Sequence, residues 1–162
     1  EVLWIPSYGP EMRGGTANVT VILSEERISS PYLKLFDTAI ILNQQSMDKF
    51  ENAVKPGGVL IYDPNGIVQH PVREDIEIYQ VDATRLAAEM GNKKVFNMII
   101  LGALLKLNPV VKMENVIQGL KESLPERYHH LLPINEAAIL EGMEKVFRFN
   151  VKKQAISEEA YA

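Results

Sequence analysis

The stretch between residues 37 and 62 constrains the fold of this chain more than any other. Residues 38–42 form a nearly continuous apolar run of strand length, which is typical of a strand covered on both faces of its sheet. A segment with helical spacing of apolar residues follows, and a second apolar run occupies residues 58–62. A strand, a helix and a strand in such close succession predict a parallel βαβ unit with a right-handed crossover. The chain is therefore expected to be an α/β protein.

Hydrophobic periodicity extends this prediction to the whole chain. Strands are expected near residues 2–6, 16–23, 38–42, 58–62 and 76–81, in one largely parallel sheet flanked by helices. The C-terminal third is expected to be helical, with a central buried helix at residues 95–107 and a last helix at about residues 135–147. We expect one α/β domain at residues 1–150 and a polar tail at residues 151–162.

Local signals indicate how these elements begin and end. Ser46 is placed to cap the first helix, and Lys55-Pro56-Gly57 to end it. Asp82 and Gly91 are expected to cap and to end the next helix. Asn97 lies on the apolar helix and is expected to be a core amide whose hydrogen bonds are satisfied.

A glycine-rich loop at residues 7–15 joins the first two expected strands. Its glycines let the backbone turn and let a ligand or a partner approach closely. Arg13 carries a planar guanidinium, which suits a carboxylate or a phosphate. The alternative is a polar surface connection in which Arg13 pairs only with Glu11 or another internal acid. The residues alone leave both interpretations open.

Polar side chains follow two of the expected parallel strands. Asn43, Gln44 and Gln45 come after one strand, and Asp63 and Asn65 come after the next. The carboxyl ends of parallel strands meet at the edge where open α/β sheets bind ligands. The simpler interpretation is that these side chains cap helices and turns.

Several stretches of the chain resemble one protein family. The most specific reads SYGPEMRGGTAN at residues 7–18 and resembles the signature of the gamma subunit of 2-oxoacid:acceptor (ferredoxin) oxidoreductases. Three further stretches fit the same family in the same order: LNQQSMDKF at residues 42–50, VKPGG at 54–58 and NMIILGA at 97–103. The resemblance runs from about residue 2 to residue 142. Members of the family begin with a strand, a glycine-rich turn and a helix, so this chain is expected to lack its first β-α unit.

The resemblance implies a subunit of an enzyme that decarboxylates a 2-oxoacid, joins the acyl group to coenzyme A and passes electrons to ferredoxin. The form of the signature leans towards 2-oxoglutarate or branched-chain 2-oxoacids rather than pyruvate. Thiamine diphosphate, magnesium and iron–sulfur clusters are then expected in partner subunits, and the isolated chain is expected to be inactive. The residues expected to contact substrate, coenzyme A or a neighbouring subunit are Ser7, Tyr8, Gly9, Glu11, Arg13, Gly14, Gly15, Asn43 and Gln44.

Composition restricts which of these functions the chain could perform by itself. It has no cysteine, so it cannot hold an iron–sulfur cluster through the usual thiolates. Its three histidines lack the spacing of a metal site, and no Gly-Asp-Gly pattern for thiamine diphosphate occurs. The net charge of −4 gives no reason to expect nucleic acid or an anionic membrane as a partner. No signal peptide or membrane span is visible, so a cytoplasmic location is expected.

The residues also allow a function of another class, a stand-alone α/β module that binds a small ligand. A monomer that retains a nucleotide through purification would favour this alternative. A cysteine-rich partner chain would favour the oxidoreductase subunit.

Overall fold

The computed structural model describes residues 1–7, 17–30 and 32–151 of the chain. Most of the expected polar tail at residues 151–162, and most of the glycine-rich loop, therefore lie outside the described residues. None of the described helices is both long and apolar enough to cross a lipid bilayer.

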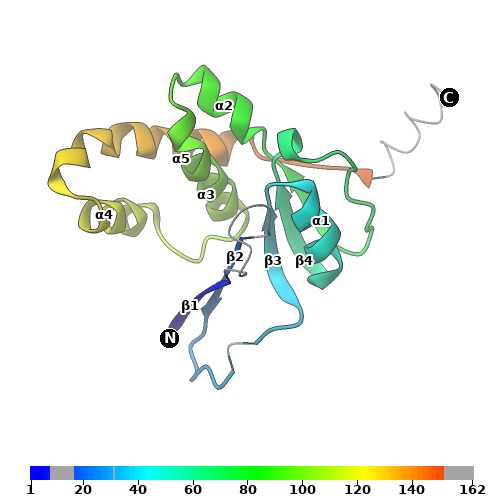
Figure 1. The fold of residues 1–162 in the computed structure, drawn as a ribbon. Coiled ribbons are helices and arrows are strands. Elements are labelled where there is room, and N and C mark those ends of the chain that lie inside the picture. Colours follow the sequence, from blue (N-terminus) through cyan, green and yellow to red (C-terminus); the bar gives the residue numbers. More distant parts are fainter. Residues whose placement is uncertain (8–16, 31, 152–162) are drawn as a thin grey trace, which may run out of the picture.

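A four-stranded sheet with the order β3-β4-β5-β6 lies at the centre of the fold (Figure 1). Its first three strands are parallel and the short fourth strand is antiparallel. The strands are β3 (Phe36–Ile41), β4 (Val54–Tyr62), β5 (Glu77–Gln80) and β6 (Phe147–Arg148). The expected α/β class with a largely parallel sheet is confirmed, and so is the βαβ unit that links β3 to β4.

Helices account for most of the second half of the chain, as expected. They are α1 (Gln44–Phe50), α2 (Ala83–Glu89), α3 (Phe96–Leu107), α4 (Met113–Ser123) and α5 (Leu132–Lys145). Short 3-10 turns occur at Glu51–Ala53, Pro64–Gly66, Lys93–Val95 and Glu126–Leu131. In Figure 1, α2, α3 and α5 lie on one side of the sheet and α1 lies on the other.

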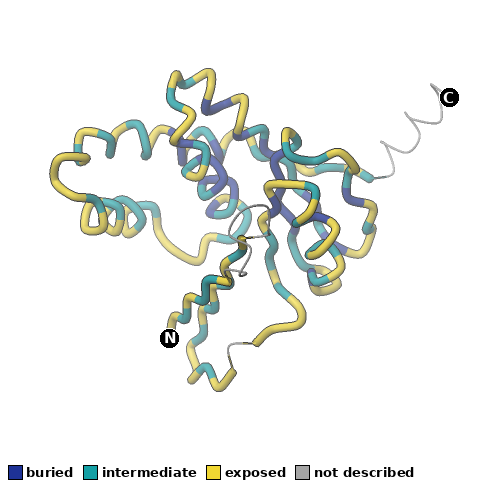
Figure 2. Tube along the Cα trace, in the orientation of Figure 1, coloured by how far each residue is buried: buried dark blue, intermediate teal, exposed yellow. Residues whose placement is uncertain are grey.

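Strand β4 divides the buried side chains into two apolar clusters. Leu60 and Tyr62 pack with residues of α1 and β3, whereas Ile61 packs with α2, α3 and α5. Neighbouring residues of a strand point to opposite faces, so one strand contributes to both clusters. All three side chains are completely buried, and Figure 2 shows the buried residues gathered along this strand and the helices beside it. The continuous apolar run at residues 58–62 is explained by this burial on both faces.

The first two strands differ from the expected arrangement. Strands β1 (Val2–Ser7) and β2 (Asn18–Leu23) form a separate two-stranded antiparallel sheet, in register from Val2 opposite Leu23 to Ser7 opposite Asn18. The expectation that they belong to the parallel sheet was therefore wrong. Parallel neighbours need a crossover long enough to return along the sheet, usually a helix, and the connection between these strands is short and rich in glycine.

Some local signals were also misassigned. Asn43, not Ser46, caps α1: its side-chain oxygen accepts a hydrogen bond from the backbone N–H of Ser46 at 2.8 Å. Residues 55–57 do not end that helix, because α1 ends at Phe50 and β4 begins at Val54, with Gly57 in the left-handed region at φ 76°. Asn97 is exposed rather than a core amide. The cap at Asp82 and the left-handed Gly91 are confirmed.

Helices α3 and α5 approach each other closely through two glycines. A Cβ atom on Gly102 of α3 would collide with the backbone carbonyl of Ile139 in α5. Reciprocally, a Cβ on Gly142 of α5 would collide with the carbonyl of Ile99 in α3. Backbone cannot yield as the end of a flexible side chain can, so both glycines are needed for this helix packing.

Replacing Gly102 by alanine is therefore expected to lower the free energy of unfolding by about 2 kcal/mol or more, because the added methyl group must separate the two helices. The matched control is Gly119→Ala in α4, where a Cβ would meet no atom within 4 Å. That change should leave stability unaltered or raise it by up to about 1 kcal/mol, since alanine favours helix. Urea unfolding followed by circular dichroism measures the free energy of unfolding of both variants. Equal stability of the two variants would contradict the close approach of α3 and α5.

Candidate functional site

The glycine-rich signature loop is anchored on the β1–β2 hairpin. Ser7 is the last residue of β1, is exposed, and lies opposite Asn18, the first residue of β2. The other expected contact residues of the loop, Tyr8, Gly9, Glu11, Arg13, Gly14 and Gly15, lie outside the described residues. The structure thus places the base of the loop at one end of the hairpin, and the function of the loop stays a prediction.

A second group of polar residues collects at the carboxyl edge of the parallel sheet. Asn43 follows β3, Asp63 and Asn65 follow β4, and Asp82 follows β5. Parallel strands end at the same edge, so residues from three separate segments meet there. Asn65 donates a hydrogen bond to Asp82, and Asp63 accepts one from Thr84 in the first turn of α2.

Asn43 and Gln44 hold the end of β3 in place. The side chain of Asn43 caps α1, and the side-chain oxygen of Gln44 accepts hydrogen bonds from the backbone N–H groups of Val68 and Gln69, both at 2.8 Å. The amide nitrogen of Gln44 donates to Asp48 at 2.7 Å. Capping and bracing, the simpler interpretation of these residues, therefore describes their observed contacts. A contact with substrate or coenzyme A remains a prediction for both.

Asp63 is a buried carboxylate with both oxygens in use. It is only 2% exposed; one oxygen accepts from the backbone and side-chain N–H groups of Asn65, each at 3.0 Å. The other accepts from the backbone N–H of Thr84 at 3.1 Å and from its hydroxyl at 2.5 Å. Asn65 also donates to Asp82 at 2.7 Å. These bonds join the end of β4 to the start of α2, and they engage both carboxylate oxygens of Asp63.

Sequence reasoning missed a cluster around Tyr62. The Tyr62 hydroxyl donates to the side-chain oxygen of Gln80 at 2.8 Å and lies 3.3 Å from Nδ1 of His70. The His70 ring stacks on Phe149, with ring centroids 5.3 Å apart. Burial raises the pKa of Tyr62 well above its usual value. No local signal could reveal this cluster, because its members are far apart in the sequence.

Arg73 was also missed, and it braces the connection between β4 and β5. Its guanidinium donates to the backbone carbonyls of Glu51 and Val54, at 2.9 and 2.7 Å, and to the carboxylate of Asp75. The hydrogen bond from Arg73 holds the pKa of Asp75 below its usual value. Arg73 is thus occupied internally by three partners, and its contacts are structural.

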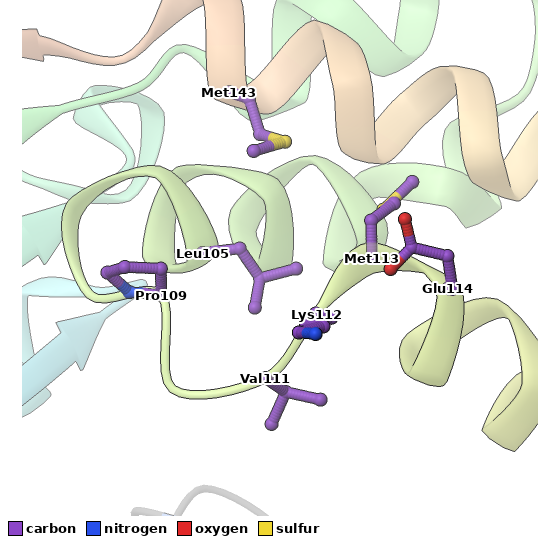
Figure 3. Close-up of a pocket in the computed structure, with 7 residues that line it drawn as sticks. All are labelled: Leu105, Pro109, Val111, Lys112, Met113, Glu114 and Met143. Carbon is purple, nitrogen blue, oxygen red and sulfur yellow. The ribbon is translucent and has the colours of Figure 1, made fainter.

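One open groove of about 560 Å³ lies beside the C-terminal end of α3 (Figure 3). It is lined by Leu105, Pro109, Val111, Lys112, Met113, Glu114 and Met143. The lining is mostly apolar, with a single ammonium and a single carboxylate, and offers no nucleophile with a base beside it. Within residues 1–7, 17–30 and 32–151, no group of three or more His, Cys, Asp or Glu residues could hold a metal ion.

Comparison with known proteins gives a consistent family assignment. A family model described as pyruvate ferredoxin/flavodoxin oxidoreductase matches residues 1–145. The 2-oxoglutarate synthase subunit KorC of Methanocaldococcus jannaschii is 34% identical over 128 residues, which cover 78% of this chain and 68% of that protein. The ketoisovalerate oxidoreductase subunit VorA of Methanothermobacter thermautotrophicus is 35% identical over 149 residues, which cover 92% of this chain and 28% of VorA.

A solved structure agrees with these sequence relatives. The gamma subunit of a keto/oxoacid ferredoxin oxidoreductase from Geobacter sulfurreducens superimposes with a TM-score of 0.71 at 28% identity, covering 90% of this chain and 79% of that one. The same module therefore occurs in chains of similar size and as about a quarter of a longer chain. The family resemblance drawn from residues 7–18 and the three later stretches is confirmed.

Replacing Asp63 by alanine is expected to lower the free energy of unfolding by on the order of 3 kcal/mol, because the donors of Asn65 and Thr84 lose a charged, buried acceptor. The matched control is Asp37→Ala. Its carboxylate is 79% exposed and pairs with Lys55 at the surface, so the change should cost about 1 kcal/mol or less. Thermal unfolding of the two variants measures the difference. A small effect of Asp63→Ala would contradict this structural function and would favour a function in ligand binding.

Proposed function

The chain belongs to the pyruvate ferredoxin/flavodoxin oxidoreductase family, and from that membership we propose that it is the gamma subunit of a 2-oxoacid:ferredoxin oxidoreductase complex. In the proposed reaction, the 2-oxoacid loses its carboxylate as carbon dioxide and its acyl carbon forms a thioester with coenzyme A. Two electrons pass to ferredoxin. The observation that carries the proposal is the match of the family model to residues 1–145, which includes the signature loop.

In this proposal, the chain serves the assembly of the complex and takes no part in electron transfer. It contains no cysteine, so the iron–sulfur clusters through which electrons travel must be held by other subunits. The polar residues at the carboxyl edge of the sheet are engaged with their own backbone or with each other. Thiamine diphosphate and magnesium are likewise assigned to partner subunits, because this chain lacks the diphosphate-binding pattern.

The substrate class favoured is 2-oxoglutarate or a branched-chain 2-oxoacid. The form of the signature at residues 7–18 supports this preference, and relatives named for 2-oxoglutarate and for ketoisovalerate are each more than 30% identical to this chain. The second candidate function is a stand-alone module that binds a small ligand. The open groove near α3 is the observation that favours it.

Purification of the tagged chain from its own cells distinguishes the two functions. We expect the eluate to contain iron and thiamine diphosphate and to reduce a dye when supplied with coenzyme A and 2-oxoglutarate or a branched-chain 2-oxoacid, and more slowly with pyruvate. The chain produced alone, with the same additions, should give no turnover above background. A chain that elutes alone with a bound nucleotide would contradict the subunit proposal.

Arg13 in the signature loop is proposed to contact coenzyme A or a neighbouring subunit. Its guanidinium can bind a phosphate through two parallel hydrogen bonds, and coenzyme A carries several phosphates. In the assembled enzyme, Arg13→Ala is expected to raise the KM for coenzyme A or to weaken assembly by about tenfold, whereas the melting temperature of the chain alone should change little. The control is Arg127→Ala, which removes an exposed guanidinium lying 4.9 Å from the ring of Tyr128.

The opposite result would support the alternative, in which Arg13 makes only an internal ion pair. If Arg13 only pairs with Glu11 or another internal acid, Arg13→Ala will lower the melting temperature of the chain alone and leave the kinetics with coenzyme A unchanged. Assembly measured by gel filtration then matches that of the Arg127→Ala control.

A further inference from the structure

The turn after β4 contains a dipeptide with a reactivity of its own. Asn65 is followed by Gly66, and no other asparagine in the chain precedes a glycine. In an Asn-Gly pair, the backbone nitrogen of the glycine attacks the side-chain carbonyl carbon of the asparagine readily, because no Cβ hinders the approach. Asparagine is in general a thermolabile residue. The sequence therefore marks Asn65 as the asparagine of this chain most prone to spontaneous deamidation.

Packing requires the glycine of this pair. Gly66 ends the 3-10 turn Pro64–Gly66, which lies against the end of β3. A Cβ atom at position 66 would collide with the backbone carbonyl of Leu42. Because that carbonyl is part of the backbone, no side-chain movement relieves the collision. A larger residue, which would slow deamidation, does not fit at this position.

Hydrogen bonding requires the asparagine. Its side-chain nitrogen Nδ2 donates to Oδ1 of Asp63 at 3.0 Å and to Oδ1 of Asp82 at 2.7 Å. An amide NH2 group has two hydrogens, so both of its donors are used. We call these two hydrogen bonds the Asn65 bridge. The bridge ties the residue that follows β4 to the residue that caps α2.

The same contacts oppose deamidation of the folded chain. Departure of Nδ2 breaks both hydrogen bonds of the Asn65 bridge. Closure of the five-membered ring also needs an extended torsion between Asn65 and Gly66, whereas a 3-10 turn holds that torsion near its helical value. The backbone of Gly66 is in addition held against Leu42. The reaction thus requires the turn to open locally.

We propose that Asn65 is a site of spontaneous deamidation, and that the Asn65 bridge suppresses the reaction in the folded chain. The backbone nitrogen of Gly66 loses its proton and forms a bond to Cγ of Asn65. The bond from Cγ to Nδ2 breaks, and Nδ2 leaves as ammonia. Water then opens the five-membered ring and yields aspartate or isoaspartate at position 65. Water is the only other reactant, and the site is independent of the proposed function.

Deamidation converts an attraction at the carboxyl edge of the sheet into a repulsion. The product carries a carboxylate where the amide of Asn65 had donated to two carboxylates. The two hydrogen bonds of the bridge are lost, and a third negative charge lies beside Asp63 and Asp82. The modification therefore weakens the junction between β4 and α2, and no step within the chain reverses it.

The rate of deamidation tests whether the folded turn is protected. The chain is purified from its own cells and incubated at mildly alkaline pH, and peptide mass spectrometry with fragmentation measures the conversion of each asparagine. In the folded chain, Asn65 should convert about tenfold more slowly or less than in the chain unfolded in urea, because reaction needs the open turn. In urea, Asn65 should convert faster than Asn97, which precedes methionine.

Asp82→Ser tests the Asn65 bridge itself. Serine still caps a helix, but the carboxylate that accepts from Asn65 is gone. Loss of this hydrogen bond should raise the rate of Asn65 conversion in the folded chain about tenfold. The matched control is Arg85→Ala, which removes the ion pair of Asp82 at 2.8 Å and leaves the Asp82 carboxylate available to Asn65. Its conversion rate should stay within about twofold of wild type.

Two substitutions of Asn65 separate the lost hydrogen bonds from the added charge. Asn65→Ala and Asn65→Asp both remove the Asn65 bridge, and only Asn65→Asp adds a carboxylate beside Asp63 and Asp82. At neutral pH the melting temperature should fall from wild type to Asn65→Ala and further to Asn65→Asp. The total decrease should be about 5 °C or more.

Four results would overturn the proposal. Asn65 that stays intact in urea is no deamidation site, and Asn65 that converts equally fast in the folded and the unfolded chain is not protected. A folded Asp82→Ser variant that converts at the wild-type rate excludes the bridge as the protection. A melting temperature of Asn65→Asp equal to that of wild type excludes the weakened junction. If circular dichroism shows that Asp82→Ser does not fold, the comparison of folded with unfolded wild type decides.

Discussion

The burial of β4 on both faces is the constraint on which the rest of the structure depends. Ile61 belongs to the cluster formed with α2, α3 and α5, while Leu60 and Tyr62 belong to the cluster on the α1 side. A strand buried in this way requires helices on both sides of the sheet, and the parallel βαβ connection provides one of them. The close packing of α3 on α5 through Gly102 and Gly142 then closes the larger cluster from outside.

The same constraint determines what the carboxyl edge of the sheet can do. Three parallel strands end together, so their terminal backbone groups and the first turns of α1 and α2 need hydrogen-bond partners. Asn43, Asp63 and Asp82 supply these partners, and Asn65 links two of them. Polar groups that would be catalytic candidates in another α/β protein are here used to satisfy the backbone.

The hairpin forms a contrast with this well-packed body. The two core clusters bury apolar side chains of the sheet and helices, whereas the large apolar side chains on one face of β1 and β2 are 48–72% exposed: Val2, Trp4, Val19, Val21 and Leu23. The signature loop is carried on this part of the chain, so family identity and apolar exposure coincide in one element.

The amino-acid sequence by itself determined the class of the fold, the family and the helices. Apolar runs and helical spacing are local properties, and the SYGPEMRGG stretch is recognisable without coordinates. Tertiary structure decided what depends on partners distant in the chain. It separated β1 and β2 from the parallel sheet, replaced Ser46 by Asn43 as the cap of α1, and placed Asn97 in solvent. It also brought His70 against Tyr62 and Phe149, and Gly102 against Ile139. Strand pairing, side-chain networks and helix contacts are set by which segments meet in space, and periodicity along one segment carries no information about its neighbour.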